Sequence, residues 1–146
     1  MMKFRLVCIG KLKEKYFVDG VNEYVKRCGR FGELRVIELP ERRTIEEEAE
    51  DVLAQAKGYV IVTDIQGDAV TSEDLAKTIG QAFSGGKSEV TFVIGSSEGL
   101  SERVKKLADK RVSFGRVTYP HQLMRVIVCE QIYRALTILN NVTYHK

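Results

Sequence analysis

The chain has 146 residues, 44% of them hydrophobic, and a formal net charge of +3 at pH 7. This length suits one folded domain, residues 1–146, and excludes a catalytic domain joined to a separate recognition module. No apolar stretch approaches the roughly 20 residues that span a bilayer, and Lys3 and Arg5 interrupt the first apolar run. We therefore expect a cytoplasmic protein with no signal peptide and no membrane partner.

The first third of the chain alternates apolar runs with amphipathic segments. Arg5–Ile9 and Leu34–Leu39 are short apolar runs that predict strands. Between them, Lys13–Cys28 has apolar residues at helical spacing, which predicts a helix. Thr44 predicts the start of a second helix, because its hydroxyl can accept from the amide of Glu47, whose carboxylate can reach back.

The same alternation continues through the second third. Tyr59–Ile65 and Val90–Ile94 are almost continuously apolar, which is typical of strands covered on both faces. Ser72–Phe83 predicts the helix between them, and a short helix over Ser101–Asp109 precedes a weak strand over Arg111–Phe114. The pattern indicates an α/β fold with a mostly parallel sheet and helices on both faces.

The segment Thr118–Lys146 predicts a long helix with apolar residues on nearly every side. Such a helix needs partners all round, so it is either deeply buried or a subunit interface. The apolar positions are Leu123, Val126, Ile127, Cys129, Ile132, Tyr133, Leu136, Ile138 and Leu139.

Three cysteines, Cys8, Cys28 and Cys129, show no CxxC spacing. Their odd number and apolar surroundings favour buried reduced thiols over disulfides or metal ligands. We expect no metal site.

Charge is distributed unevenly along the chain. Residues 1–31 carry a net charge of +5, residues 32–100 carry −8, and residues 101–146 carry +6. If the two basic ends meet in space, they form a face suited to a polyanion such as RNA. The alternative is that these cations simply solvate the outer helices.

A glycine-containing segment, Ile94–Leu100 (IGSSEGL), follows the predicted strand Val90–Ile94. Ligands of open α/β sheets bind at the carboxyl ends of strands, where glycine allows close approach to the backbone. Gly95 and Gly99 match neither the dinucleotide fingerprint nor the Walker motif. A ligand loop and a simple turn therefore both remain open.

Polar residues lie at both ends of the predicted terminal helix. His121 and Arg125 are four residues apart and share one face near its start. They could orient a nucleophile or neutralise an anion, or they could be a capping histidine and an arginine bound to backbone carbonyls. Glu130 and Arg134, also four apart, predict a structural ion pair.

A polar tail follows the predicted helix. It contains Asn140, Asn141, Thr143, Tyr144 and His145. Chain ends are usually frayed, but a tail placed directly after an interface helix can reach a neighbouring subunit's site.

Three segments together carry a family resemblance that covers essentially the whole chain. GKLKEKY, FVIGSSEGL and TYPHQLMRV with its continuation EQIYRA and YHK resemble the SPOUT-class methyltransferases that modify pseudouridine in large-subunit ribosomal RNA. The resemblance implies a C-terminal trefoil knot, a homodimer and S-adenosylmethionine as methyl donor. It also implies 23S rRNA, within the assembled ribosome, as the partner that is methylated at ring nitrogen 3 of a pseudouridine.

The resemblance also implies the site residues. The donor is expected to contact a residue at the end of the third strand, the first glycine of the loop and the segment before the terminal helix. These positions are Thr63, Gly95, Phe114, Gly115, Arg116, Val117, Thr118 and Tyr119, and the catalytic candidates are His121, Arg125, Tyr144 and His145. We expect Arg125, Tyr144 and His145 to hold the nucleotide and His121 to shape the loop.

The sequence departs from the family pattern at two positions. The family commonly has Leu at the position of Thr63 and often a second Gly at the position of Ser96. Two rival readings stay open: a ribosome-assembly or RNA-binding factor that has lost catalysis, and a flavodoxin-like nucleotide-binding regulator. The identity of the general base is left open as well.

Overall fold

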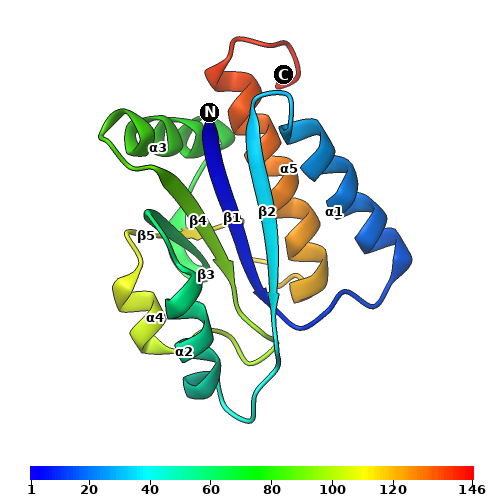
Figure 1. Cartoon of the computed structure of the whole chain (residues 1–146), viewed down its shortest axis with the longest axis vertical. Coiled ribbons are helices and arrows are strands. Elements are labelled where there is room, and N and C mark those ends of the chain that lie inside the picture. Colours follow the sequence, from blue (N-terminus) through cyan, green and yellow to red (C-terminus); the bar gives the residue numbers. More distant parts are fainter.

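A computed structural model describes all 146 residues, in which five strands and five helices alternate (Figure 1). The first six elements are β1 (Met2–Ile9), α1 (Lys15–Cys28), β2 (Gly32–Leu39), α2 (Ile45–Gln55), β3 (Tyr59–Ala69) and α3 (Ser72–Ser84). The last four are β4 (Glu89–Ile94), α4 (Glu102–Leu107), β5 (Lys110–Ser113) and α5 (His121–Leu139).

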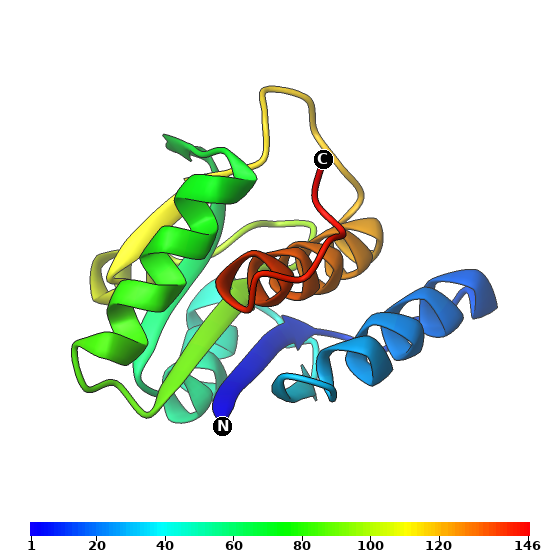
Figure 2. The ribbon, with the colours of Figure 1, turned by 90° about the horizontal axis from the view of Figure 1, so that it is seen from above.

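The five strands form one parallel sheet in the order β2-β1-β4-β3-β5. Helices α1, α3 and α5 cover one face, and α5 lies between α3 and α1 when the molecule is viewed from above (Figure 2). Helices α2 and α4 pack on the opposite face. The predicted α/β class with a parallel sheet and helices on both faces is confirmed.

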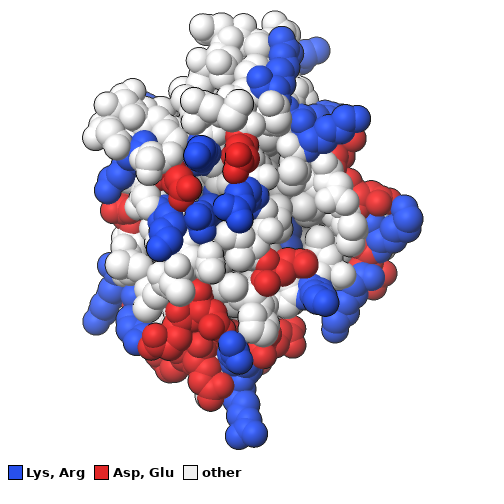
Figure 3. Space-filling model, in the orientation of Figure 1, with Lys and Arg blue, Asp and Glu red and all other residues white.

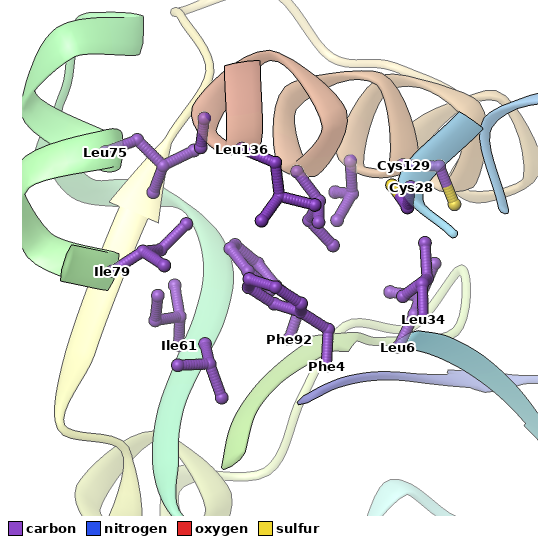
Figure 4. Packing of buried hydrophobic residues seen from close by; sticks show 14 of the residues in the cluster. Phe4, Leu6, Cys28, Leu34, Ile61, Leu75, Ile79, Phe92, Cys129 and Leu136 are labelled. Atoms are coloured by element: carbon purple, nitrogen blue, oxygen red, sulfur yellow. The ribbon is translucent and has the colours of Figure 1, made fainter. Parts of the chain in front are cut away.

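The larger part of the core lies between the sheet and helices α1, α3 and α5. Phe4 and Phe92, from neighbouring strands, point toward Leu136 of α5 and Ile79 of α3 (Figure 4). Burial of each such side chain contributes about 1.5–3 kcal/mol. Cys28 belongs to the same cluster.

All three cysteines are buried and free, as predicted. Burial raises the pKa of the Cys8 thiol to about 11, so this thiol is protonated at pH 7. None of the helices has both the length and the apolar character required to cross a bilayer.

The strand boundaries differ from the prediction mainly in β3. This strand does not end at Ile65 but continues to Ala69, because it pairs with β5 a second time after an irregularity between Thr63 and Asp68. A Cβ at Gly67 would lie 2.7 Å from the carbonyl oxygen of Arg111, so the close passage of the two strands requires glycine.

The other strands differ from the prediction at their ends. β1 begins at Met2 rather than Arg5, β2 at Gly32 rather than Leu34, and β4 one residue early. β5 is Lys110–Ser113, so Phe114 lies in the loop that follows.

The helix starts follow the predicted capping chemistry in part. Thr44 Oγ1 accepts from the Glu47 amide, but the reciprocal bond, from the Thr44 amide to the Glu47 carboxylate, is absent. A complete capping box occurs instead at α3, between Thr71 and Asp74.

The short helix α4 ends before the predicted residue, and the terminal helix ends where the polar tail was expected to begin. Helix α4 ends at Leu107, because Asp109 leaves the helix and accepts from the Val60 amide at 2.8 Å. The terminal helix is α5, with Pro120 immediately before it and a non-helical tail after Leu139.

Candidate functional site

Two adjoining cavities of about 170 and 350 Å³ lie at the irregularity of β3 that begins at Thr63, beside the loop after β4 and the start of α5. Both are lined by Thr63, Asp64, Ile65, Tyr119 and Met124. This is the carboxyl edge of a parallel sheet, where ligands of α/β proteins bind. The cavities bring together residues as distant in sequence as Thr63 and Met124.

Seven of the eight residues predicted to contact a donor line these cavities. The smaller cavity contains Thr63, Phe114, Gly115, Val117, Thr118 and Tyr119, and the larger one contains Gly95. The eighth, Arg116, is exposed in the same loop and lines neither cavity.

The loop after β4 is a closed turn. The Gly99 amide donates to the Ser96 carbonyl at 2.9 Å, and the two residues form an isolated antiparallel bridge. A Cβ at position 95 would lie 2.6 Å from the Gly99 carbonyl oxygen, and Gly99 has φ +89°. Both glycines are therefore required by the geometry of this loop.

Thr63 is half-buried, and its side chain is bonded to the sheet. Its hydroxyl donates to the Val93 carbonyl at 3.3 Å. The hydroxyl proton of Thr63 therefore has a hydrogen-bond partner within the sheet, so the polar side chain is accommodated at this position.

Asp64 is a cavity residue that the sequence reasoning missed. Its side chain is 6% exposed and lies between Arg111 Nη1, at 3.4 Å, and Lys105 Nζ, at 3.9 Å. It directly follows the apolar run of β3, and an acidic residue at the end of a parallel strand was a signal that could have found it.

The loop before α5 passes over the smaller cavity. It begins at Ser113, whose hydroxyl donates to the Gly115 carbonyl at 2.9 Å, and Gly115 has φ +116°. Val117 is 64% exposed despite its apolar side chain.

His121 lines the larger cavity at the first turn of α5. Its Nδ1 is buried without a hydrogen-bond partner. Burial, followed by the nearby Arg125 guanidinium, lowers the pKa of this imidazole below 6.5, so the ring is neutral at pH 7.

Arg125 is fully buried, with an exposed fraction of 0%. Its Nη2 donates to the carbonyls of Ile9 and Gly10 at 2.7 and 2.8 Å, and its Nη1 donates to Glu38 Oε2 at 2.9 Å. Of the two roles considered for Arg125, the structure shows the arginine bound to backbone carbonyls. Its guanidinium is not positioned to contact a nucleotide.

The tail folds back on its own chain. Tyr144 donates its hydroxyl to Glu130 Oε2 at 2.8 Å, and His145 Nδ1 lies 3.0 Å from Arg134 Nη1, while its Nε2 contacts Glu73. Burial, followed by the bond to Glu130, raises the pKa of the Tyr144 phenol, so the phenol is neutral at pH 7.

The four predicted catalytic residues therefore do not meet within one chain. Tyr144 is anchored at Glu130, nine residues beyond His121, which corresponds to about 13 Å along the helix axis. The predicted Glu130–Arg134 ion pair is present at 2.6 Å, and it holds the tail.

The two basic ends of the sequence do come together, because α1 packs beside α5. Many of their cations are paired: Lys15 with Asp19, Arg27 with Glu23, and Arg134 with Glu130. Figure 3 shows carboxylates gathered over the end of the molecule that holds α2, with Lys and Arg dispersed elsewhere on this face.

No group of three or more His, Cys, Asp or Glu side chains is placed to hold a metal ion.

Residues 2–145 match the family model described as predicted SPOUT methyltransferase. The sequence is 46% identical to the ribosomal RNA large subunit methyltransferase H of Lactobacillus gasseri and 42% identical to that of Enterococcus faecalis. Each alignment covers 99% of this chain and 100% of the relative.

Solved structures share the fold. A probable methyltransferase from Bordetella pertussis superposes with a TM-score of 0.60 at 12% identity, covering 92% of this chain and 96% of the other. A tRNA (m1G37) methyltransferase from Aquifex aeolicus gives 0.55 at 18% identity, covering 91% and 69%. At these identities the likeness concerns the fold alone.

Proposed function

The chain belongs to the SPOUT methyltransferase family, and we propose that it methylates ring nitrogen 3 of a pseudouridine in 23S rRNA, with S-adenosylmethionine as methyl donor. The substrate is this 23S rRNA within the assembled ribosome. Two full-length relatives named ribosomal RNA large subunit methyltransferase H support this proposal.

The observation that carries the proposal is the pair of cavities at the irregularity of β3 and the carboxyl ends of β4 and β5. The residues present fit S-adenosylmethionine: apolar side chains such as Ile65 and Met124 suit its apolar surfaces. Gly99 lines the larger cavity and no atom lies within 4 Å of its Cβ position, so the loop backbone can approach a ligand closely there. When bound, the donor supplies an electrophilic sulfonium methyl group.

The reaction joins the ring nitrogen to that methyl carbon while the carbon–sulfur bond breaks. The nitrogen also loses its proton, so a proton acceptor near the cavity accelerates the reaction. His121 lines the cavity and is neutral at pH 7, so we assign it as the acceptor in addition to its loop-shaping role. Alignment of the two reactants within the cavity lowers the barrier further.

Arg125 takes a different role from the one expected. Its bonds to Ile9, Gly10 and Glu38 fix the start of α5 against the ends of β1 and β2. We assign it as a positioning residue that places His121, one helical turn away, at the cavity. Tyr144 and His145 remain the residues that hold the nucleotide.

A homodimer follows from the separation of the tail and the cavity within one chain. Helix α5 keeps apolar side chains such as Leu123 and Ile127 only half-buried, which suits an isologous contact with a second α5. The tail of a second copy then supplies the nucleotide-holding residues. We also propose that the segment from Gly95 onward passes through the chain as a trefoil knot.

The direct test of the donor is calorimetry with S-adenosylmethionine. The proposal expects binding heat with a stoichiometry of one donor per chain. A non-catalytic assembly factor would show no heat, and that result would overturn the enzymatic proposal. Methylation of purified assembled ribosomes, free 23S rRNA and unmodified control RNA by the protein then tests the substrate, with methyl transfer expected on the ribosomes alone.

A further inference from the structure

Glu48 is a buried carboxylate with no cationic partner. It lies on α2 with 7% exposure, and it forms no salt bridge: no charged side-chain nitrogen of Lys, Arg or His lies within 4.0 Å of its carboxylate oxygens. A buried charge is costly unless hydrogen bonds compensate it. Here Oε2 accepts from the Arg42 amide at 3.2 Å, and Oε1 accepts from the Ser96 hydroxyl at 3.1 Å.

Ser96 connects this carboxylate to the loop after β4. Its hydroxyl donates to Glu48 and also accepts from the Glu98 amide at 3.3 Å, while its carbonyl accepts from the Gly99 amide. One serine therefore closes the loop internally and bonds it to α2.

The loop depends on this link because its other residues offer little conformational restraint. Gly95 and Gly99 flank the turn, and glycine has more backbone freedom to lose than any other residue. Gly95 and Ser96 both line the larger cavity. A hydrogen bond from this loop to a fixed carboxylate on α2 therefore restrains the backbone that faces the ligand.

We propose that Glu48 is a positioning residue for the donor-binding loop and acts on it through Ser96. The proposal rests on the proposed function of the cavity as the S-adenosylmethionine site. Ser96 stands where the family often has a second glycine. Its hydroxyl adds a hydrogen bond to Glu48 that a glycine cannot make. Glu48 also holds the Arg42 amide, so it joins the segments that follow β2 and β4.

The test measures the dissociation constant of S-adenosylmethionine by calorimetry for wild type, Ser96→Ala, Glu48→Gln and the double variant. Ser96→Ala removes only the hydroxyl, and we expect about tenfold weaker binding, as for loss of a hydrogen bond to a charged group. The double variant should bind no more than about twofold weaker than Ser96→Ala, because both changes break one link.

Thr91→Val provides the matched control. Thr91 is also a buried hydroxyl that joins two segments, since it donates to the Lys57 carbonyl at 2.7 Å and accepts from the Lys57 amide. Its loss should lower the melting temperature and leave donor binding unchanged. A purely structural role for Ser96 predicts the same behaviour as Thr91→Val.

Two results overturn the inference: wild-type affinity in Ser96→Ala, or fully additive losses in the double variant. If Glu48→Gln does not fold, wild-type affinity in Ser96→Ala is still sufficient to refute it. Absence of binding heat with the wild-type protein is a separate result, because it contradicts the proposed donor itself.

Discussion

Arg125 shows that a charged residue on an apolar helix can belong to the protein interior. Its four-residue spacing from His121 was visible in the sequence, but its partners lie 87 to 116 residues away along the chain. Local spacing therefore predicted a shared helix face and left the functional and structural readings open. The hydrogen bonds to Ile9 and Gly10 resolve that choice in favour of positioning.

Glu38→Ala is expected to lower the free energy of unfolding by about 2 kcal/mol. The change leaves the buried Arg125 guanidinium without its carboxylate, and the loss is below the 3–5 kcal/mol of fully buried pairs because Glu38 is 35% exposed. Urea unfolding measures it. Glu33→Ala, on the exposed side of the same strand, serves as the control and should change stability by less than about 0.5 kcal/mol. Equal losses in the two variants would contradict the positioning role of the Glu38–Arg125 pair.

The activity of the protein is expected to persist below pH 6.5. A proton acceptor works in its neutral form, and the pKa of His121 is lowered, so protonation begins only at a pH below the ordinary histidine value. The pH profile of kcat/KM should show an acid limb with its midpoint below 6.5, and His121→Asn should lose that limb. An unchanged limb in the variant would exclude His121 as the acceptor.

At the scale of elements, sequence patterns predicted the order and type of every helix and strand because apolar periodicity reports burial directly. The end of β3 could not be predicted, since Gly67 and Asp68 are residues typical of turns. Their strand conformation depends on β5, which is distant in sequence. The contacts of the tail with Glu130 and Glu73 could not be predicted either, because they too join residues that are not neighbours in sequence.

Removal of the tail is expected to abolish turnover without affecting the donor. Truncation before Thr143 eliminates Tyr144 and His145, neither of which lines the cavities. Methyl transfer should fall about a hundredfold, as expected for a misplaced substrate, while calorimetry gives an unchanged donor affinity. Tyr144→Phe removes only the bond to Glu130 and should have a smaller effect. Normal turnover in the truncated protein would refute the role of the tail.

At the scale of the whole molecule, the sequence predicted a parallel sheet but not its order. β4 lies between β1 and β3, so the chain must cross over from one strand position to another. The spacing of apolar residues within each segment does not specify that crossover. The cavity residues were predicted through a family resemblance, whereas composition and spacing alone left the glycine loop ambiguous. The role of Glu48 became visible only when α2 and the loop after β4 were seen together.

The proposed homodimer should be visible by sedimentation at twice the chain mass of 16.5 kDa. Ile127→Lys places a charge on the half-buried face of α5 and should shift the protein toward monomer. Leu107→Lys makes the same kind of change at an apolar residue of α4 that is already 51% exposed, and it should leave the dimer intact. A wild-type monomer at micromolar concentration would contradict the composite site.

The most direct test of the account is mass spectrometry of 23S rRNA from cells with and without the gene for this chain. The account predicts that its loss removes a single methyl group from one pseudouridine, and that the wild-type gene restores it. An identical set of modifications in both strains would contradict the assignment of this protein as the methyltransferase.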